Sequence, residues 1–344
     1  MSKDTGISWT ESTWDPIVGC SIVSPGCTNC YAQKMAHKIK HMEDARTGSA
    51  DASHYFGTTK VVNGNPVWTG LLKLAPDHIL TAPLRWKKPR RIFVNSMSDL
   101  FHENVPDAWI DRVFAVMALC PQHTFQILTK RSKRMREWMT PARATSVGME
   151  GFEMTLNAHA SARDEGRESR VGAGVQLTGD IAHLKLWPLP NVWLGVSCED
   201  QERAAERVPD LLATPAAKRF VSAEPLLGPI EFRDLPVPEG TVFHGTSGTY
   251  DALSGRFWLA VGDADEEMDH QRQLACDEVK LDWIIVGGES GRGHRHMQIE
   301  WAESIMRQCE DAGTPFFFKQ DSGLKPGQRG RASEDLWACK AVPV

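Results

Sequence analysis

The stretch IFVNSMSDL at residues 92–100 decides the fold class, because its apolar run ends in small and polar residues and a helical segment follows. That segment, DAWIDRVFAVMALC at 107–120, has apolar residues at helical spacing. Further runs of the strand type recur along the chain, namely FQILTKR (125–131), NVWLGVSCED (191–200), RFVSAEP (219–225), DWIIVGGES (282–290) and PFFFKQ (315–320). The chain therefore has a βα rhythm.

Continuous apolar strands that alternate with amphipathic helices predict an α/β protein with a parallel sheet buried on both faces. With a first strand near residues 14–18 the count reaches about seven, which favours a partial or full parallel (β/α) barrel of the TIM type. We expect residues 1–344 to form a single domain of this kind with three insertions, at about 44–70, 140–185 and 232–280. The second insertion is interpreted as a lid, and the third has the pattern of a hairpin.

Composition narrows the classes of function. The chain has 41% hydrophobic and 24% charged residues, as ordinary globular proteins do. A formal net charge of -5 argues against nonspecific coating of nucleic acid, but it leaves room for a local basic groove. No stretch approaches the roughly 18 consecutive apolar residues of a membrane helix, and the N-terminus lacks a signal-peptide core. We therefore expect a cytoplasmic protein without a membrane partner.

Three of the eight cysteines cluster in GCSIVSPGCTNCYA at residues 19–32. Cys20, Cys27 and Cys30 form a C-x6-C-x2-C pattern, and clustered thiols in a reducing compartment favour metal or redox chemistry over disulfides. A 4Fe-4S cluster held by three cysteines leaves one iron open for a ligand. A structural zinc site would need a fourth ligand, and His37 and His41 on the following helix keep that alternative open.

Seven sequence blocks carry a family resemblance, and they run in order from Trp9 to Gln320. They are WTESTWDPIVGCSIVSPGCTNCYAQKMA, RRIFVNSMSDLFHENVP, FAVMALCPQHTFQILTKR, NVWLGVSCEDQ, FVSAEPLLGPI, IIVGGESG and TPFFFKQ. With these blocks the chain resembles the phage- and prophage-associated three-Cys-motif family of radical S-adenosylmethionine-like proteins. The wider radical S-adenosylmethionine superfamily usually has the spacing C-x3-C-x2-C, so the first gap is longer here.

The resemblance implies a 4Fe-4S cluster ligated by Cys20, Cys27 and Cys30, with S-adenosylmethionine chelating the open iron. An electron from the cluster would generate a 5'-deoxyadenosyl radical, and a donor such as flavodoxin or ferredoxin would supply that electron. The phage association makes a nucleic-acid base or nucleotide the expected substrate, in DNA modification or repair. The alternatives are a noncatalytic binding module stabilised by zinc or an iron-sulfur cluster, and a radical enzyme acting on a peptide or small metabolite.

Polar residues at the carboxyl ends of the expected strands are the candidate cofactor contacts, because chemistry in parallel barrels gathers there. The resemblance implies that Ser96, Ser98 and Asp99 contact the methionine amino group. It also implies that Ser197 and Glu199 hold the ribose hydroxyls. Internal salt bridges are the alternative use of such charged residues in a barrel.

The adenine contact and the catalytic residues complete the expected site. The superfamily's aromatic residue before the third cysteine is replaced here by Asn29, so Tyr31 is expected to contact the adenine. The isolated Cys198 is interpreted as a packed core thiol. The candidates for contact with the substrate or the cofactor carboxylate are Lys130, Glu224, Glu289 and Lys319.

Overall fold

A computed structural model describes residues 5–49, 53–141, 187–239, 248–259, 272–274 and 279–343. The chain divides into two compact units, Met1–Trp193 and Leu194–Val344, and each is described by itself. Seven strands form a sheet in the order β1-β6-β7-β8-β9-β13-β14. Their bounds are β1 Ser12–Trp14, β6 Arg91–Val94, β7 Thr124–Thr129, β8 Val192–Ser197, β9 Lys218–Ala223, β13 Trp283–Gly287 and β14 Phe316–Gln320. The α/β class is confirmed, and an open strand order is consistent with a partial barrel.

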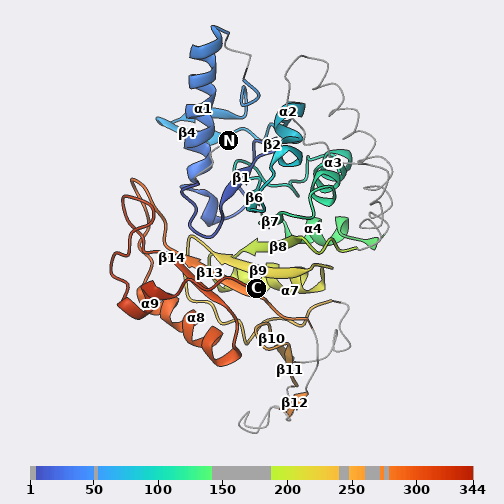
Figure 1. Cartoon of the computed structure of the whole chain (residues 1–344). Helices are drawn as coiled ribbons and strands as arrows, with labels where there is room; N and C mark the ends of the chain where they lie inside the picture. Colours follow the sequence, from blue (N-terminus) through green and yellow to red (C-terminus); the bar gives the residue numbers. More distant parts are fainter. Residues whose placement is uncertain are drawn as a thin grey trace. The chain divides into compact units, whose positions relative to one another are not determined.

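In the first unit the strands β1, β6 and β7 run parallel (Figure 1). The register pairs Thr13 with Phe93 and Phe93 with Gln126, so these three side chains share one face of the sheet. Between β6 and β7 lies α3 (Asp107–Ala118), whose apolar face is buried, and α4 (Ser132–Trp138) follows β7. The strand and helix alternation expected from residues 92–131 is confirmed.

Shorter elements of the first unit surround the segment that carries the three cysteines. The insertion at about 44–70 contains a hairpin beside α1, and its two turn residues, Asn63 and Gly64, both have positive φ, as a type I′ turn requires (Figure 1). These elements are β2 (Ile17–Val18), the short 3₁₀ helix η1 (Pro25–Cys27), α1 (Tyr31–Thr47), β3 (Thr59–Val62), β4 (Asn65–Trp68), β5 (Lys73–Leu74), α2 (Asp77–Leu80) and η2 (Ala82–Arg85).

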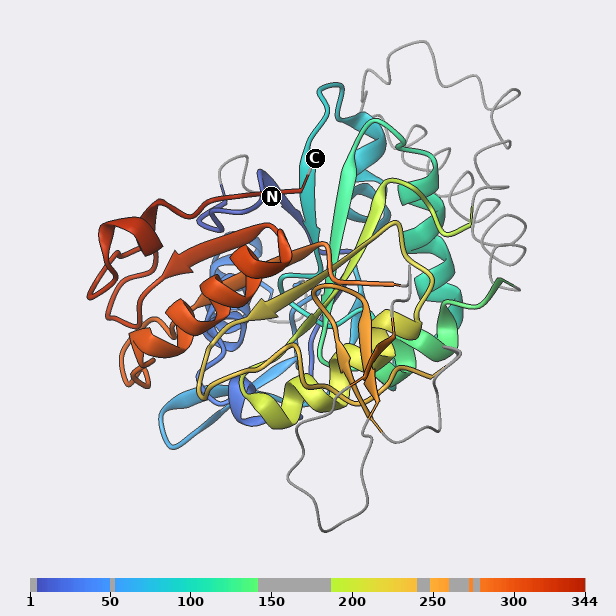
Figure 2. The same ribbon diagram turned by 90° about the horizontal axis from the view of Figure 1, so that it is seen from below.

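In the second unit the strands β9, β13 and β14 run parallel. Helix α7 (Gln201–Ala213) precedes β9, and its first turn is capped by the Asp200 carboxylate, which accepts a hydrogen bond from the Arg203 amide. Helix α8 (Ile299–Ala312) joins β13 to β14 and lies along both strands, and α9 (Glu334–Ala338) contacts β14 (Figure 2). The expected strands at 219–225, 282–290 and 315–320 are therefore confirmed.

The two remaining insertions have different outcomes. The hairpin pattern at about 232–280 is confirmed by a three-stranded antiparallel sheet of β10 (Gly248–Asp251), β11 (Arg256–Leu259) and β12 (Arg272–Leu274). The expected lid at about 140–185 lies almost wholly outside the described residues, so it stays a prediction. Among the helices that the structure describes, none has the length and apolar character needed to cross a membrane.

Candidate functional site

The three cysteines lie on the segment between β2 and α1, which we call the Cys loop (residues 19–30). Cys27 ends η1, and Cys30 is the residue before α1. All three are half-buried free thiols. The Gln33 side chain donates a hydrogen bond to the Cys27 carbonyl over 3.0 Å, which ties the loop to the helix. Cys20 and Cys30 pack against an apolar cluster, which consists of Val18, Ala32, Ala36, Tyr55, Trp68 and Met97.

Gly19 sets the path of the chain into the Cys loop. Its φ is +96°, a conformation that side chains disfavour, and its amide donates to the Met97 carbonyl over 3.2 Å. A Cβ atom built on Gly19 would lie only 2.0 Å from the Leu71 carbonyl oxygen. Only glycine therefore fits at the position before Cys20.

A buried arginine touches the first cysteine of the loop. The Arg131 guanidinium is 3.0 Å from an Asp99 carboxylate oxygen and 3.8 Å from the Cys20 sulfur. It also donates to a Glu103 carboxylate oxygen over 3.0 Å and to the Ser21 hydroxyl over 2.8 Å. Asp99 and Arg131 follow β6 and β7, so the register of these strands is what brings the guanidinium to the sulfur.

Burial and charge both act on the thiols. Burial raises the pKa of Cys20 to about 12, and the charges of Asp99 and the other two cysteines act in the same direction, whereas Arg131 opposes them. Burial also raises the pKa of Cys30, opposed by backbone amides at the start of α1 that hydrogen-bond its sulfur. The thiols of Cys20 and Cys30 are thus held protonated near neutral pH by the protein alone, and a bound cation would be needed to ionise them.

The residues after β6 make internal contacts. Asp99 accepts hydrogen bonds from the Thr129 hydroxyl at 2.7 Å and from the Lys130 amide at 3.0 Å, in addition to the guanidinium described above. The Ser98 hydroxyl donates to the Ile17 carbonyl over 2.8 Å. Both predicted cofactor residues are therefore engaged in holding strand ends together, and a contact with the methionine amino group stays a prediction.

Asp15, at the end of β1, is a site residue that sequence reasoning missed. Its carboxylate accepts hydrogen bonds from the Ser96 hydroxyl and the Met97 amide, each over 2.9 Å. Burial raises the pKa of Asp15 to about 6, and the two hydrogen bonds act in the opposite direction. Tyr31, which is half exposed at 50%, donates from its hydroxyl to the Ser96 carbonyl over 3.4 Å. The predicted Tyr31 and Ser96 are thus brought together.

Two buried carboxamides, Asn95 and Gln126, were also missed. Asn95 directly follows β6 and has a φ of +60°, and Gln126 lies in β7 opposite Phe93 in the register. Their side chains are 2% and 0% exposed, and none of their four polar atoms has a hydrogen-bond partner in the described structure. A glutamine inside the apolar run FQIL was the available signal.

In the second unit, the predicted cofactor residues lie beside a buried arginine. Glu199 is fully buried, and its carboxylate is 3.1 Å from the Arg207 guanidinium. Arg207 also donates to the Ser197 carbonyl over 2.7 Å. A ribose contact of Glu199 stays a prediction, and the ion pair with Arg207 is the internal salt bridge that the sequence offers as the alternative. Cys198 is fully buried, as expected for a packed core thiol.

Ion pairs also engage the predicted catalytic carboxylates. Glu224 pairs with Lys319 over 2.5 Å. Glu289 pairs with the Arg295 guanidinium over 2.5 Å and accepts a second bond from its amide over 2.8 Å. Lys130, in the first unit, is half-buried, and its amide is bound by Asp99 as described. Catalytic roles for these residues stay predictions.

No three His, Cys, Asp or Glu side chains in the described ranges are arranged to hold a metal ion. The Cys loop, His37 and His41 all lie within these ranges, so neither a three-thiol site nor a Cys3His site is preassembled. The imidazoles of His37 and His41 contact each other instead. The donor set of the Cys loop is therefore chemically suited to a metal but not yet in coordination geometry.

Residues 4–336 match the profile of a protein family of unknown function, DUF5131. The chain belongs to this family. The comparisons with curated proteins and with solved structures find no significant match. The DUF5131 description carries no activity, so the chemistry of the site is the basis for a functional proposal.

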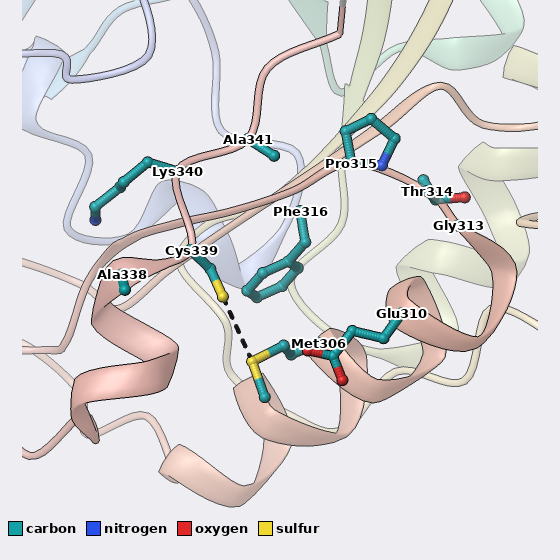
Figure 3. Close-up of a pocket in the computed structure, with 10 residues that line it drawn as sticks. All are labelled: Met306, Glu310, Gly313, Thr314, Pro315, Phe316, Ala338, Cys339, Lys340 and Ala341. Carbon is teal, nitrogen blue, oxygen red and sulfur yellow. Dashed lines mark hydrogen bonds between the residues drawn. The ribbon is translucent and has the colours of Figure 1, made fainter.

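The second unit of this DUF5131 protein also has an open pocket between α8, the start of β14 and the end of α9 (Figure 3). None of the predicted site residues lines it. Its lining is Met306, Glu310, Gly313, Thr314, Pro315, Phe316, Ala338, Cys339, Lys340 and Ala341. The Cys339 and Met306 sulfurs are 3.7 Å apart, and Figure 3 shows them facing each other across the pocket floor.

Proposed function

We propose that this DUF5131 protein is a radical S-adenosylmethionine enzyme whose 4Fe-4S cluster is held by Cys20, Cys27 and Cys30. The observation that carries the proposal is the environment of the loop sulfurs. A buried guanidinium lies 3.8 Å from the Cys20 sulfur, and amides at the start of α1 hydrogen-bond the sulfur of Cys30. Positive charge and N–H donors beside thiolates are how proteins stabilise and tune iron-sulfur clusters.

The residues present fit this cluster by the chemistry of their donors. Thiolates are the ligands of iron-sulfur centres, and the three cysteines on the loop are free thiols. Because burial raises the pKa of two of them, cluster loading must release protons. Loading would also draw the sulfurs into the coordination geometry that the described structure does not yet have.

When bound, such a cluster supplies the electron for reductive cleavage of S-adenosylmethionine. Around it, the half-exposed ring of Tyr31 offers an apolar face for the adenine, and its hydroxyl contact with Ser96 orients that ring. The buried carboxamides of Asn95 and Gln126 offer donors and acceptors to the polar groups of the cofactor. A ligand that satisfied them would remove a desolvation cost of about 1–3 kcal/mol for each group.

The proposed substrate is a nucleic-acid base or nucleotide. This substrate class is supported by the family resemblance and by one face of α1, where Lys34 and Lys38 are exposed one turn apart. Exposed basic side chains of this kind can contact the phosphates of a nucleic acid. Fluorescence anisotropy with a labelled oligonucleotide should show binding that weakens with salt, and Lys34→Gln with Lys38→Gln should reduce the salt dependence.

The enzyme class is tested by anaerobic reconstitution with iron and sulfide. We expect brown protein that absorbs near about 400 nm. Incubation with dithionite and S-adenosylmethionine should then yield 5'-deoxyadenosine by mass spectrometry, because uncoupled cleavage does not require the substrate.

Two cysteine variants make the test specific. Cys27→Ser should lose both the absorbance and the 5'-deoxyadenosine. Cys339→Ser should keep both, because Cys339 is a half-buried cysteine outside the Cys loop. Stoichiometric zinc with no iron uptake, or global unfolding of Cys27→Ser, would instead favour the structural-metal alternative.

A further inference from the structure

Helix α1 carries a pair of histidines outside the Cys loop. His37 and His41 are four residues apart, so their side chains lie on the same face in consecutive turns. Their Nε2 atoms are 3.1 Å apart, and their ring centroids are separated by 4.4 Å with the rings at 79°. His37 is half-buried and His41 is exposed, so solvent ions have access to the pair.

The separation of the two nitrogens matches that of two ligands on one metal ion. Imidazole nitrogens bind zinc at about 2.0–2.1 Å, which places two of them about 2.9–3.4 Å apart at octahedral or tetrahedral bond angles. The observed 3.1 Å falls within this range. Little movement of either ring is therefore needed for both to bind the same ion.

A neighbouring hydroxyl orients the His37 ring for such a role. The Nδ1 atom of His37 is 3.4 Å from the Thr59 hydroxyl at the start of β3. Donation from Nδ1 to that oxygen leaves the lone pair on Nε2, which faces His41, and metal-binding histidines commonly have such an outer partner. Burial and the nearby His41 and Lys40 also lower the pKa of His37, which keeps it in the neutral form that binds metals.

The geometry points to His37 and His41 as a two-histidine chelate for a first-row divalent transition ion such as Ni²⁺, Cu²⁺ or Zn²⁺. In the described part of the chain no third His, Cys, Asp or Glu completes a three-ligand group around them. Water therefore takes the other coordination positions, and the ion exchanges with solvent. Once bound, it links consecutive turns of the helix that begins directly after Cys30.

Calorimetric titration of the full-length protein with Ni²⁺ tests this site. Wild type should bind one ion at the pair, and His37→Gln and His41→Gln should each weaken that step at least about tenfold, as loss of a ligand does. His296→Gln is the matched control, because His294 and His296 also contact each other, with ring centroids 5.1 Å apart. This control should keep the step, and Thr59→Val should weaken it by less than the ligand variants.

A variant of the Cys loop distinguishes Ni²⁺ binding at the histidine pair from Ni²⁺ binding at the cysteines. The same Ni²⁺ step should survive in Cys20→Ser, so the result is independent of the proposed enzyme class. Persistence of the step in both histidine variants, or its equal loss in His296→Gln, would overturn the proposal. Circular dichroism confirms the fold of each variant, and because His41 is exposed, His41→Gln decides the outcome if His37→Gln perturbs the helix.

Discussion

Each unit has a buried arginine and carboxylate pair at the end of a strand, and the two pairs differ in what else the arginine touches. Arg131 and Asp99 are 3.0 Å apart in the first unit, and Arg207 and Glu199 are 3.1 Å apart in the second. In its other described hydrogen bond, Arg207 donates to the backbone carbonyl of Ser197. Arg131 instead reaches a hydroxyl of the Cys loop and the sulfur of Cys20.

A buried ion pair is therefore by itself weak evidence of function. Such pairs arise wherever a strand end and a helix must be joined without leaving a charge unpaired. What marks the first unit is that its cation is shared with a thiol of the Cys loop. In the second unit the predicted catalytic carboxylates each form an ion pair, Glu224 with Lys319 and Glu289 with Arg295.

The largest expected effect is on stability, and it should be the same in both units. Arg131→Met and Arg207→Met each leave a buried carboxylate without its cation, which costs about 3–5 kcal/mol. Urea unfolding should show a similar loss in the two variants. A much smaller loss for Arg207→Met would break the comparison, because Arg207 is then not holding a buried charge.

The next effect concerns pH. Folding raises the pKa of the Asp15 carboxyl from 3.8 to about 6, so the folded protein binds this proton more tightly than the unfolded chain does. The resulting stability is complete below pH 3.8 and is lost as pH rises through about 6, a change of about 3 kcal/mol. The free energy of unfolding of Asp15→Asn, relative to that of wild type, should therefore be higher at pH 7.5 than at pH 4.5. Urea unfolding of both proteins at the two pH values measures this difference. Equal differences at the two pH values would mean that Asp15 is ionised throughout.

A third effect sharpens the contrast between the arginines. Arg131→Lys keeps the positive charge but loses the planar fork that reaches the carboxylates and the loop hydroxyl together. We expect cluster affinity to fall about tenfold, as for the loss of an outer contact to a metal ligand, measured by iron retention against a chelator. Arg207→Lys is the control and should retain iron as wild type does, whatever its stability.

The smallest effect is expected at the Glu224 and Lys319 pair. Their side chains are 20% and 14% exposed, so water screens part of the attraction. Glu224→Gln should cost about 1 kcal/mol or less in the free energy of unfolding. If 5'-deoxyadenosine production is unchanged while conversion of an added oligonucleotide is lost, Glu224 acts on the substrate, which would set it apart from Glu199.

The strands of the sheet and the Cys loop could be predicted from the amino-acid sequence. Strands such as 92–94 and 283–287 were recognised because burial on both faces forces a continuous apolar run, which is a local property of the chain. The cysteines were recognised because all three lie within eleven residues, 20–30.

Which polar groups contact each other could not be predicted from the sequence. Arg131 is 111 residues from the Cys20 sulfur that it contacts, and Lys319 is 95 residues from Glu224. Asp15 and Asn95 look unremarkable in sequence, and only the fold shows that Asp15 accepts bonds from Ser96 and Met97 and that the described part of the structure leaves the buried amide of Asn95 without a partner. The physical reason is that apolar periodicity is a property of one continuous segment. An ion pair or a buried amide without a partner depends instead on the register between strands that are distant in the chain.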